Sequence, residues 1–169
     1  MFSAKVQDAI NKQINNELSA SYTYLAMSSY CDRENFLGCS RWLRLQSQEE
    51  YDHAMRLLDF LLARDGNVKL EAIAEPDVKY KSIAAIFEQA YDQEKETTTE
   101  IDELYDLTHK EKAFAALVEL QWFITEQVEE EKTAREIVAK FHQCKDDPSA
   151  LMDLDRELGA RVAGAAAPA

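Results

Sequence analysis

The chain has 169 residues, enough for one domain with a substantial core but too few for two ordinary domains. It contains only 4 glycines and 3 prolines, and strong helix formers dominate, so we expect an all-α fold. The formal net charge of −13 argues against nucleic acid as a partner and favours cations. We find no apolar run of about 18 residues and no charged-then-apolar leader, so we predict no membrane span, no secretory signal and a cytoplasmic location.

The three cysteines carry little functional signal. Cys31, Cys39 and Cys144 are odd in number and show no C-x-x-C spacing. We interpret them as reduced packing residues. A structural zinc site or a rubredoxin-like site is therefore not expected.

The first half of the chain predicts two long helices and a crossover. The first helix should run from about residue 3 to 33, followed by a turn at 35–38. The second should run from about 39 to 64 and end at Asp65-Gly66-Asn67, a helix-stop signal. Residues 68–81 contain Pro76 and no helical period. This segment is too long for a tight hairpin, so it is predicted to be a crossover.

The second half predicts two more long helices and a short fifth one. Ser82 should cap a helix to about residue 109, and a turn at 110–112 should lead into a helix over 113–143. Asp147-Pro148 should begin a short fifth helix over about 148–163, before a frayed tail at 164–169. Its apolar stripe would consist of Leu151, Leu154, Leu158 and Val162. The whole chain is thus predicted to be one domain, a four-helix bundle over about 3–144 with a long crossover and a fifth C-terminal helix.

Polar side chains interrupt the apolar seam of all four long helices. Steps of seven residues keep side chains on one seam of a bundle. They place polar residues at matching points of the two halves, because adding 77 to Glu17, Glu50 and His53 gives Glu94, Gln127 and Glu130. The pattern indicates a buried metal site.

The reason is energetic. An ionised carboxylate withdrawn from water costs several kcal/mol, whereas a folded domain has only ~5–15 kcal/mol of net stability, so four of them could not stay buried unpaired. No lysine or arginine lies on these seams near the acids, which leaves metal ions or extensive protonation. The alternative, a wet edge of the bundle, requires four helices to place polar residues at one level by coincidence.

The spacing is close to that of carboxylate-bridged di-metal proteins. These use a glutamate from each of two helices and Glu-x-x-His from each of the other two. The chain keeps Glu17, Glu94 and Glu50-x-x-His53, but has Gln127-x-x-Glu130 in place of the second Glu-x-x-His.

At these residues the chain closely resembles the non-haem ferritins of bacteria, over nearly its whole length. The matching residues are Glu17, Tyr24, Glu49-Glu50-Tyr51-Asp52-His53, Glu94, and Trp122 with Glu126-Gln127-Val128-Glu129-Glu130. The resemblance implies a ferritin-like fold and an iron-storage function. It also implies a ferroxidase centre that oxidises Fe²⁺ with O₂ or H₂O₂, and a homo-oligomeric cage of twenty-four subunits that stores a ferric mineral, with the fifth helix around four-fold axes.

The same resemblance assigns ligands. Glu17, Glu50 and His53 would hold one iron, with Glu50 bridging to a second iron held by Glu94 and Glu130. Gln127 would be a weak ligand or a neighbour of the ligands. Acids matching Glu49, Glu126 and Glu129 carry a third iron site in these ferritins.

Several other residues have two interpretations. Tyr24 lies one heptad from Glu17, either as a core tyrosine hydrogen-bonded to a carboxylate or as a one-electron donor, and both roles are open. Trp122 is interpreted first as a packing residue, with electron relay as the alternative. His109 and His142 lie near helix ends, where a cation complements the helix dipole, and receive no metal.

The competing functional class is a di-iron oxidase or peroxidase of rubrerythrin type, or a manganese catalase. The absent cysteine knuckle, the missing second Glu-x-x-His and the extra fifth helix argue against it. A haem-binding bacterioferritin would need that Glu-x-x-His and a haem-ligating methionine, but Tyr51 stands before Asp52, so no haem is expected. A helical scaffold without redox activity would require the seam acids to be accidental.

Overall fold

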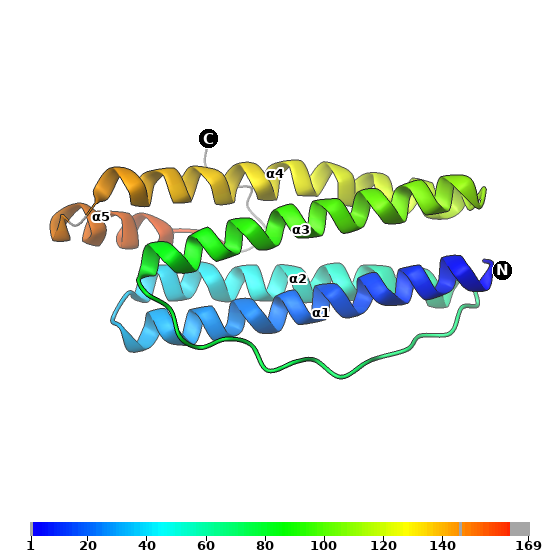
Figure 1. Ribbon diagram of the computed structural model, residues 1–169, viewed down its shortest axis with the longest axis horizontal. Helices are drawn as coiled ribbons and strands as arrows, with labels where there is room; N and C mark the ends of the chain where they lie inside the picture. Colours follow the sequence, from blue (N-terminus) through cyan, green and yellow to red (C-terminus); the bar gives the residue numbers. More distant parts are fainter. Residues whose placement is uncertain (1, 146, 163–169) are drawn as a thin grey trace.

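A computed structural model describes residues 2–145 and 147–162. Its helices are α1 Ala4–Arg33, α2 Leu37–Ala63, α3 Ile83–Lys110, α4 Phe114–Cys144 and α5 Pro148–Gly159, and the described residues form no strand. The four long helices lie side by side, while the segment after α2 runs the length of the bundle to reach α3 (Figure 1). The predicted all-α bundle with a long crossover and a short fifth helix is therefore confirmed.

Side chains cap the starts of α1, α3 and α5, and the cap predicted at Ser82 is confirmed. Ser3 Oγ accepts a hydrogen bond from the Val6 amide at 3.3 Å, and Ser82 Oγ accepts one from the Ala85 amide at 3.1 Å. Asp147 caps α5 in the same way, with Oδ1 2.8 Å from the Ser149 amide. These side chains satisfy amide groups that have no partner within the helix.

Two predicted boundaries are wrong. Helix α2 already begins at Leu37, because Glu34, Asn35 and Phe36 suffice for the turn, with Asn35 at a positive φ of 63°. Helix α5 ends at Gly159 rather than near residue 163, so Val162 does not join the buried stripe and is 64% exposed. Leu154 and Leu158 are buried as predicted. The tail at 164–169 lies outside the described residues.

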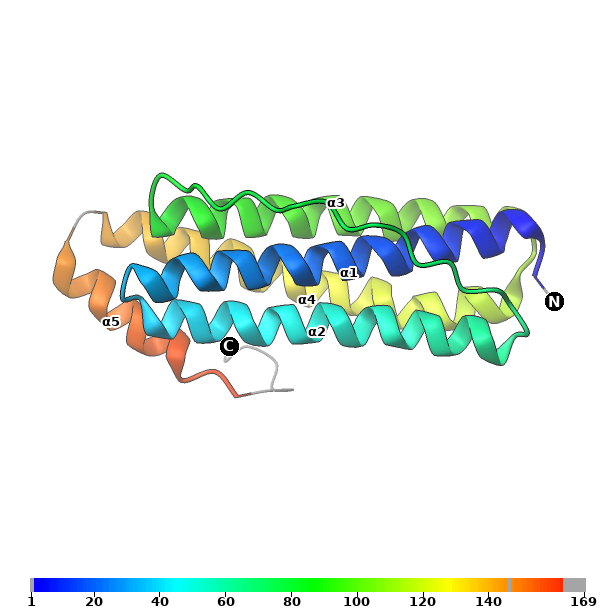
Figure 2. The ribbon, with the colours of Figure 1, turned by 90° about the horizontal axis from the view of Figure 1, so that it is seen from below.

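The crossover is held by side chains of α1. The Asn11 side chain bonds the Asn67 carbonyl and the Lys69 amide, at 2.8 and 2.7 Å. Asn15 repeats this one turn later with the Lys69 carbonyl and the Glu71 amide, both at 2.8 Å. The two asparagine side chains thus satisfy backbone amide and carbonyl groups of the crossover, which has no regular hydrogen-bonding partner of its own. They hold the crossover along α1 (Figure 2).

The core consists of two apolar clusters with the polar seam residues between them. One cluster surrounds Trp42, Phe87 and Phe141, whose rings pack at centroid distances of 5.6 and 4.8 Å. The other includes Leu57 and Phe123 near the opposite end of the bundle. Along every long helix, the polar seam residue lies between the members of these two clusters.

Helix α5 docks on the start of α2. The Asp155 carboxylate accepts hydrogen bonds from the amides of Gly38 and Cys39, at 3.1 and 2.8 Å. A Cβ at Gly38 would lie 1.7 Å from the Asp155 carbonyl oxygen, and one at Gly159 would lie 3.0 Å from Gly38 Cα. The two glycines therefore permit backbone contact between the helices.

The cysteines behave as predicted. Cys31 and Cys39 are free and buried, and Cys144 is free and partly buried. Burial raises the pKa of the Cys31 thiol to about 12 and that of Cys39 as well, so both stay protonated. Among the described helices, none combines the length and apolarity needed to cross a membrane.

Candidate metal centre

The seam residues meet inside the bundle. Six side chains from four helices are at most 7% exposed, namely Glu17, Glu50, His53, Glu94, Gln127 and Glu130. Such burial excludes the wet-edge alternative. The fold has therefore gathered four carboxyl groups in a region from which water is excluded.

One half of the cluster joins α1 and α2. Glu17, Glu50 and His53 each offer a ligand atom, and these three atoms lie within 4.8 Å of one another. His53 Nδ1 is 3.3 Å from Glu50 Oε2. Gln13 Nε2 donates to Glu17 Oε1 at 3.0 Å, whereas Glu17 Oε2 is buried with no hydrogen-bond partner. An orphaned carboxylate oxygen beside an imidazole suits a cation.

The other half joins α3 and α4. Tyr24 donates a hydrogen bond to Glu94 Oε1, and Gln127 Nε2 donates to Glu94 Oε2 at 3.1 Å and to the Glu94 carbonyl at 3.0 Å. Gln127 thus turns its amide nitrogen toward Glu94, so here it is a hydrogen-bond donor to a candidate ligand. Across the cluster, Gln46 Nε2 donates to Glu130 Oε2 at 2.8 Å.

Burial raises the pKa of each of the four carboxyl groups. Burial raises the pKa of Glu17, and the neighbouring charge of Glu50 raises it further. Burial and the charges of Glu94 and Glu130 raise the pKa of Glu50. Burial, followed by the charge of Glu94, raises the pKa of Glu130 to about 8. A divalent cation bound among these groups would favour their ionised forms and replace protons.

The pKa of Glu94 is also raised by burial, but two hydrogen bonds oppose the shift. Both the Tyr24 hydroxyl and the Gln127 amide stabilise its charged form. Tyr24 itself is fully buried, and its pKa is raised by burial and by the Glu94 charge, so it stays a neutral donor. The expected hydrogen bond between Tyr24 and a carboxylate is thus present.

The three acids expected at a third iron do not form one cluster in the described residues. Glu126 lies with His53 and Glu130, with ligand atoms within 4.8 Å of one another. Glu129 is exposed on α4. Glu49 Oε2 is instead 2.5 Å from Arg161 Nη2.

Sequence reasoning missed Gln46 and Arg161. Gln46 lies seven residues before His53 on the same seam, and this position could have identified it as a neighbour of the candidate ligands. Arg161 lies beyond α5, where no heptad pattern reaches, yet its side chain is only 9% exposed. The expectation that no lysine or arginine lies on the seams near the acids is not contradicted, because Arg161 reaches Gln46 and Glu49 from beyond α5.

The aromatic and histidine assignments are consistent with the structure. Trp122 packs edge-on against the His53 ring at a centroid distance of 5.3 Å. His142 is exposed and lies 2.7 Å from Glu88 Oε1, and His109 is exposed near the end of α3. Neither histidine belongs to a candidate metal group among the described residues.

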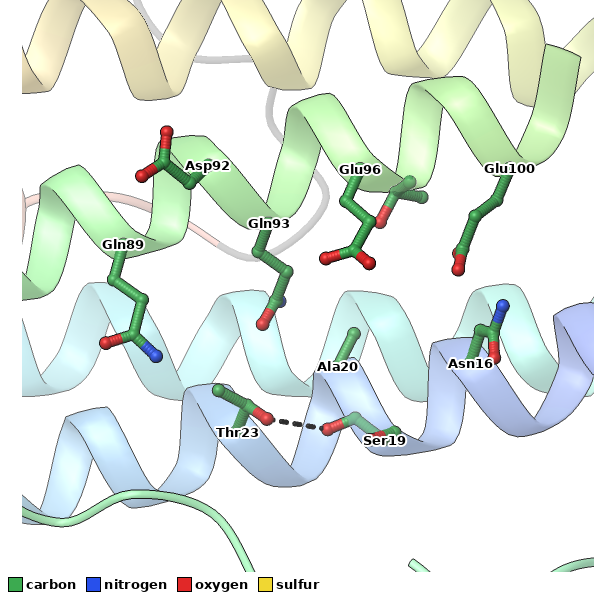
Figure 3. Close-up of a pocket in the computed structure, with 10 residues that line it drawn as sticks. Asn16, Ser19, Ala20, Thr23, Gln89, Asp92, Gln93, Glu96 and Glu100 are labelled. Atoms are coloured by element: carbon green, nitrogen blue, oxygen red, sulfur yellow. Dashed lines mark hydrogen bonds between the residues drawn. The ribbon is translucent and has the colours of Figure 1, made fainter. Parts of the chain in front are cut away.

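A polar cavity of about 410 Å³ lies between α1 and α3, outside the cluster. Figure 3 shows Glu96 and Glu100 of α3 and Asn16 of α1 among its lining side chains. Its lining includes none of the candidate ligands, although Asn16 and Gln93 are the chain neighbours of Glu17 and Glu94. The candidate metal centre is thus a compact buried cluster rather than part of this cavity.

Comparison with known proteins agrees with this geometry. The family model of the ferritin-like domain matches residues 7–144. The chain belongs to the ferritin family. It is 37% identical to a bacterial non-heme ferritin of Bacteroides fragilis, covering 95% of this chain and 100% of that one. It is 32% identical to one from Staphylococcus aureus, covering 96% and 98%.

Solved ferritin structures share the fold. An open-pore ferritin from the archaeon Archaeoglobus fulgidus superposes with a TM-score of 0.94 at 44% identity, covering 96% of this chain and 99% of that one. A humanized archaeal ferritin gives a TM-score of 0.94 at 42% identity, with coverage of 96% and 98%. The resemblance inferred from the sequence and the ferritin-like fold are confirmed.

Proposed function

We propose that this ferritin stores iron: it oxidises Fe²⁺ to Fe³⁺ at a di-iron centre within each subunit and holds the product as a ferric mineral inside a cage of twenty-four subunits. The protein would act in the cytoplasm, with Fe²⁺ and either O₂ or H₂O₂ as substrates. The observation that carries the proposal is the buried cluster of four carboxyl groups and one imidazole. The carboxyl groups can all be ionised in this buried region only if cations balance their negative charge.

The donor set supports iron as the substrate. Glu17, Glu50 and His53 would bind one Fe²⁺, and Glu94 and Glu130 the other, with Glu50 between them. Four carboxylates then balance the charge of two Fe²⁺ ions, so the low-dielectric interior holds no net charge. Carboxylate oxygens also suit Fe³⁺ as hard ligands, and the second iron has no fixed nitrogen ligand. We infer that this second ion leaves readily, which favours turnover into a store over permanent retention.

A third iron at Glu49, Glu126 and Glu129 is part of the proposal. In support, Glu126 lies within 4.8 Å of His53 and Glu130, at the edge of the cluster. Such a site would receive ions as they leave the centre.

Single substitutions at the centre test the proposal. Glu50→Ala and His53→Ala should abolish rapid oxidation of two Fe²⁺ per subunit, because the bridge or the nitrogen ligand is lost. Neither change adds buried negative charge, so circular dichroism should show an intact fold. Stopped-flow mixing of anaerobically loaded protein with O₂ or H₂O₂ gives the rates. His142→Ala, at an exposed histidine, is the control. Fast oxidation that persists in Glu50→Ala contradicts the assignment.

Two further measurements separate storage from other di-iron functions. Excess Zn²⁺ should inhibit oxidation by occupying the same ligands, because sites of this kind generally bind Zn²⁺ more tightly than Fe²⁺. Size-exclusion chromatography with mass measurement should give a large shell that takes up many irons per subunit. A small oligomer limited to two irons per subunit would instead indicate an oxidase or peroxidase of rubrerythrin type.

A further inference from the structure

Arg161 carries a positive charge to the edge of the metal cluster. It follows α5, and its side chain is only 9% exposed. Its Nη1 donates to Gln46 Oε1 at 2.8 Å, and its Nη2 donates to Glu49 Oε2 at 2.5 Å. The guanidinium carbon also lies 4.6 Å from the centroid of the Trp42 ring. Arg161 is therefore held on three sides by residues of α2.

The contact with Gln46 fixes the orientation of that amide. A guanidinium has only donors, so Gln46 must turn its oxygen toward Arg161. Its Nε2 then faces the cluster, where it is 2.8 Å from Glu130 Oε2 and 3.4 Å from Glu50 Oε1. One hydrogen-bonded path thus runs from the end of α5 to two candidate ligands.

The contact with Glu49 creates a competition. Glu49 is one of the three acids proposed for a third ion, yet the guanidinium already neutralises it. Two positive charges on one partly buried carboxylate repel each other strongly, because screening by water is weak there. A cation can use Glu49 fully only when Arg161 has moved away.

We propose that Arg161 is a built-in competitor of the third metal ion: it holds Glu49 in an ion pair, and a third ion binds only by displacing it. The inference rests on the proposed di-metal function. It predicts that the third ion binds with low affinity because it must displace Arg161, so ions pass through this position instead of staying. It also predicts that filling this position frees Gln46 and the segment after α5.

Zinc titration of the assembled, metal-free protein tests the competition. We expect two tight Zn²⁺ ions per subunit and a third, weaker one by calorimetry. Arg161→Gln removes the competing charge, so the third ion should bind on the order of tenfold more tightly, corresponding to about 1.4 kcal/mol. Arg156→Gln is the matched control, because Arg156 is an exposed arginine of α5 paired with Asp153, and it should leave all three affinities unchanged.

Further variants assign the effect to Glu49. Glu49→Gln should remove the third ion in the presence and absence of Arg161, while the two tight ions remain. Arg161→Lys keeps the charge and should keep the wild-type affinity for the third ion. An unchanged third affinity in Arg161→Gln overturns the competition, as does a third ion that persists in Glu49→Gln. If Glu50→Ala leaves the two tight ions unaffected, the di-metal proposal itself fails. This outcome can be distinguished from the two outcomes that would overturn the competition at Glu49.

Hydrogen exchange gives a readout that does not depend on any Arg161 variant. In the wild type, amides of residues 160–162 should exchange faster at Zn²⁺ concentrations that fill the third position than at those that fill two. In Glu49→Gln this difference should vanish. Equal protection at both zinc concentrations in the wild type contradicts displacement of Arg161.

Discussion

At the scale of single residues, hydrogen bonds decide how readily each buried carboxyl group ionises. Glu94 receives bonds from Tyr24 and Gln127, which lower its pKa against the effect of burial. Glu17 receives one bond from Gln13 and has an oxygen without a partner, and its pKa is raised well above the ordinary value. The two candidate iron positions therefore differ in proton affinity as well as in their ligands.

Tyr24→Phe separates the structural from the redox role of the tyrosine. The variant keeps the ring but loses the bond to Glu94, so stability should fall by ~1 kcal/mol, typical of one hydrogen bond. The pKa of Glu94 should rise, so Zn²⁺ should bind more weakly near neutral pH. Tyr30→Phe, which loses a bond to the Tyr80 carbonyl near the crossover, is the control.

Rapid-freeze paramagnetic resonance during oxidation tests electron donation by the same residue. A donor role predicts a tyrosyl radical in the wild type that Tyr24→Phe lacks. A radical that is unchanged in the variant would assign the donor to another tyrosine or to Trp122. The metal ligands would be unaffected by that result.

The metal-free protein should lose stability as pH rises. Glu130 has a folded-state pKa of about 8 against an ordinary value of 4.5, so between these values the folded state binds more protons than the unfolded state. Its contribution is complete below the unfolded pKa and is lost as pH rises through the folded pKa. In a domain of this size each 1 kcal/mol changes Tm by about 2–4 °C.

Calorimetric scans between pH 5 and pH 8.5 measure this effect. Glu130→Gln should flatten the decline, since the amide cannot ionise. Saturating Zn²⁺ should reverse it, because metal binding replaces protons and strengthens as pH rises. A metal-free wild type whose Tm increases steadily over this range would contradict the assigned proton-binding state.

At the scale of elements, the contact between α2 and α5 depends on a glycine. A methyl group at Gly38 would lie 1.7 Å from a backbone oxygen of α5, which cannot give way as a flexible side chain can. Gly38→Ala should therefore displace α5, at a cost of roughly 1–3 kcal/mol, the usual range for overpacking. Hydrogen exchange of the α5 amides should increase.

Gly66→Ala provides the matched control. A Cβ there would lie 2.4 Å from Leu61 Cδ1, 2.8 Å from Leu61 Cγ and 3.0 Å from the Leu61 carbonyl oxygen, so the strain falls at the end of α2 and not at its contact with α5. We expect α5 to stay protected in that variant. Unchanged protection of α5 in Gly38→Ala would show that the helix docks through Asp155 and its apolar stripe alone.

At the scale of the whole molecule, apolar side chains on one face support the proposed assembly. Tyr22 and Leu25 of α1 and Val78 of the crossover are 47%, 41% and 51% exposed, and together with Pro76 they line a groove of about 400 Å³. Exposed apolar side chains gathered in one groove are typical of an interaction site, and Arg33 and Glu75 also line this groove. These lining residues come from α1 and from the crossover, which runs beside α1 (Figure 2).

Leu25→Glu should therefore reduce the assembled mass, because a charge would be buried between subunits. Light scattering after size-exclusion chromatography measures the mass, and circular dichroism checks the fold. Leu25→Met conserves volume and apolarity and should assemble as the wild type does. A full-sized shell in Leu25→Glu would remove this face from the contacts between subunits.

The sequence by itself determined the helices and the candidate ligands on their seams. Ser3 and Ser82 cap helices through local hydrogen bonds, and heptad spacing placed Glu17, Glu50, Glu94 and Glu130 on inward faces, where they are buried. Both signals come from residues near one another in the chain, with a fixed period. The acids stood out because a bundle core rarely holds unpaired charge.

Only the tertiary structure decided the contacts between distant segments. Asp155 caps α2 from another helix, and Asn11 holds a crossover more than fifty residues away, without any local period. Arg161 belongs to this class too, since it reaches Glu49 only because α5 ends early and docks at the start of α2. A helical period fixes which face a residue occupies, whereas the packing of separate elements fixes which side chain it meets.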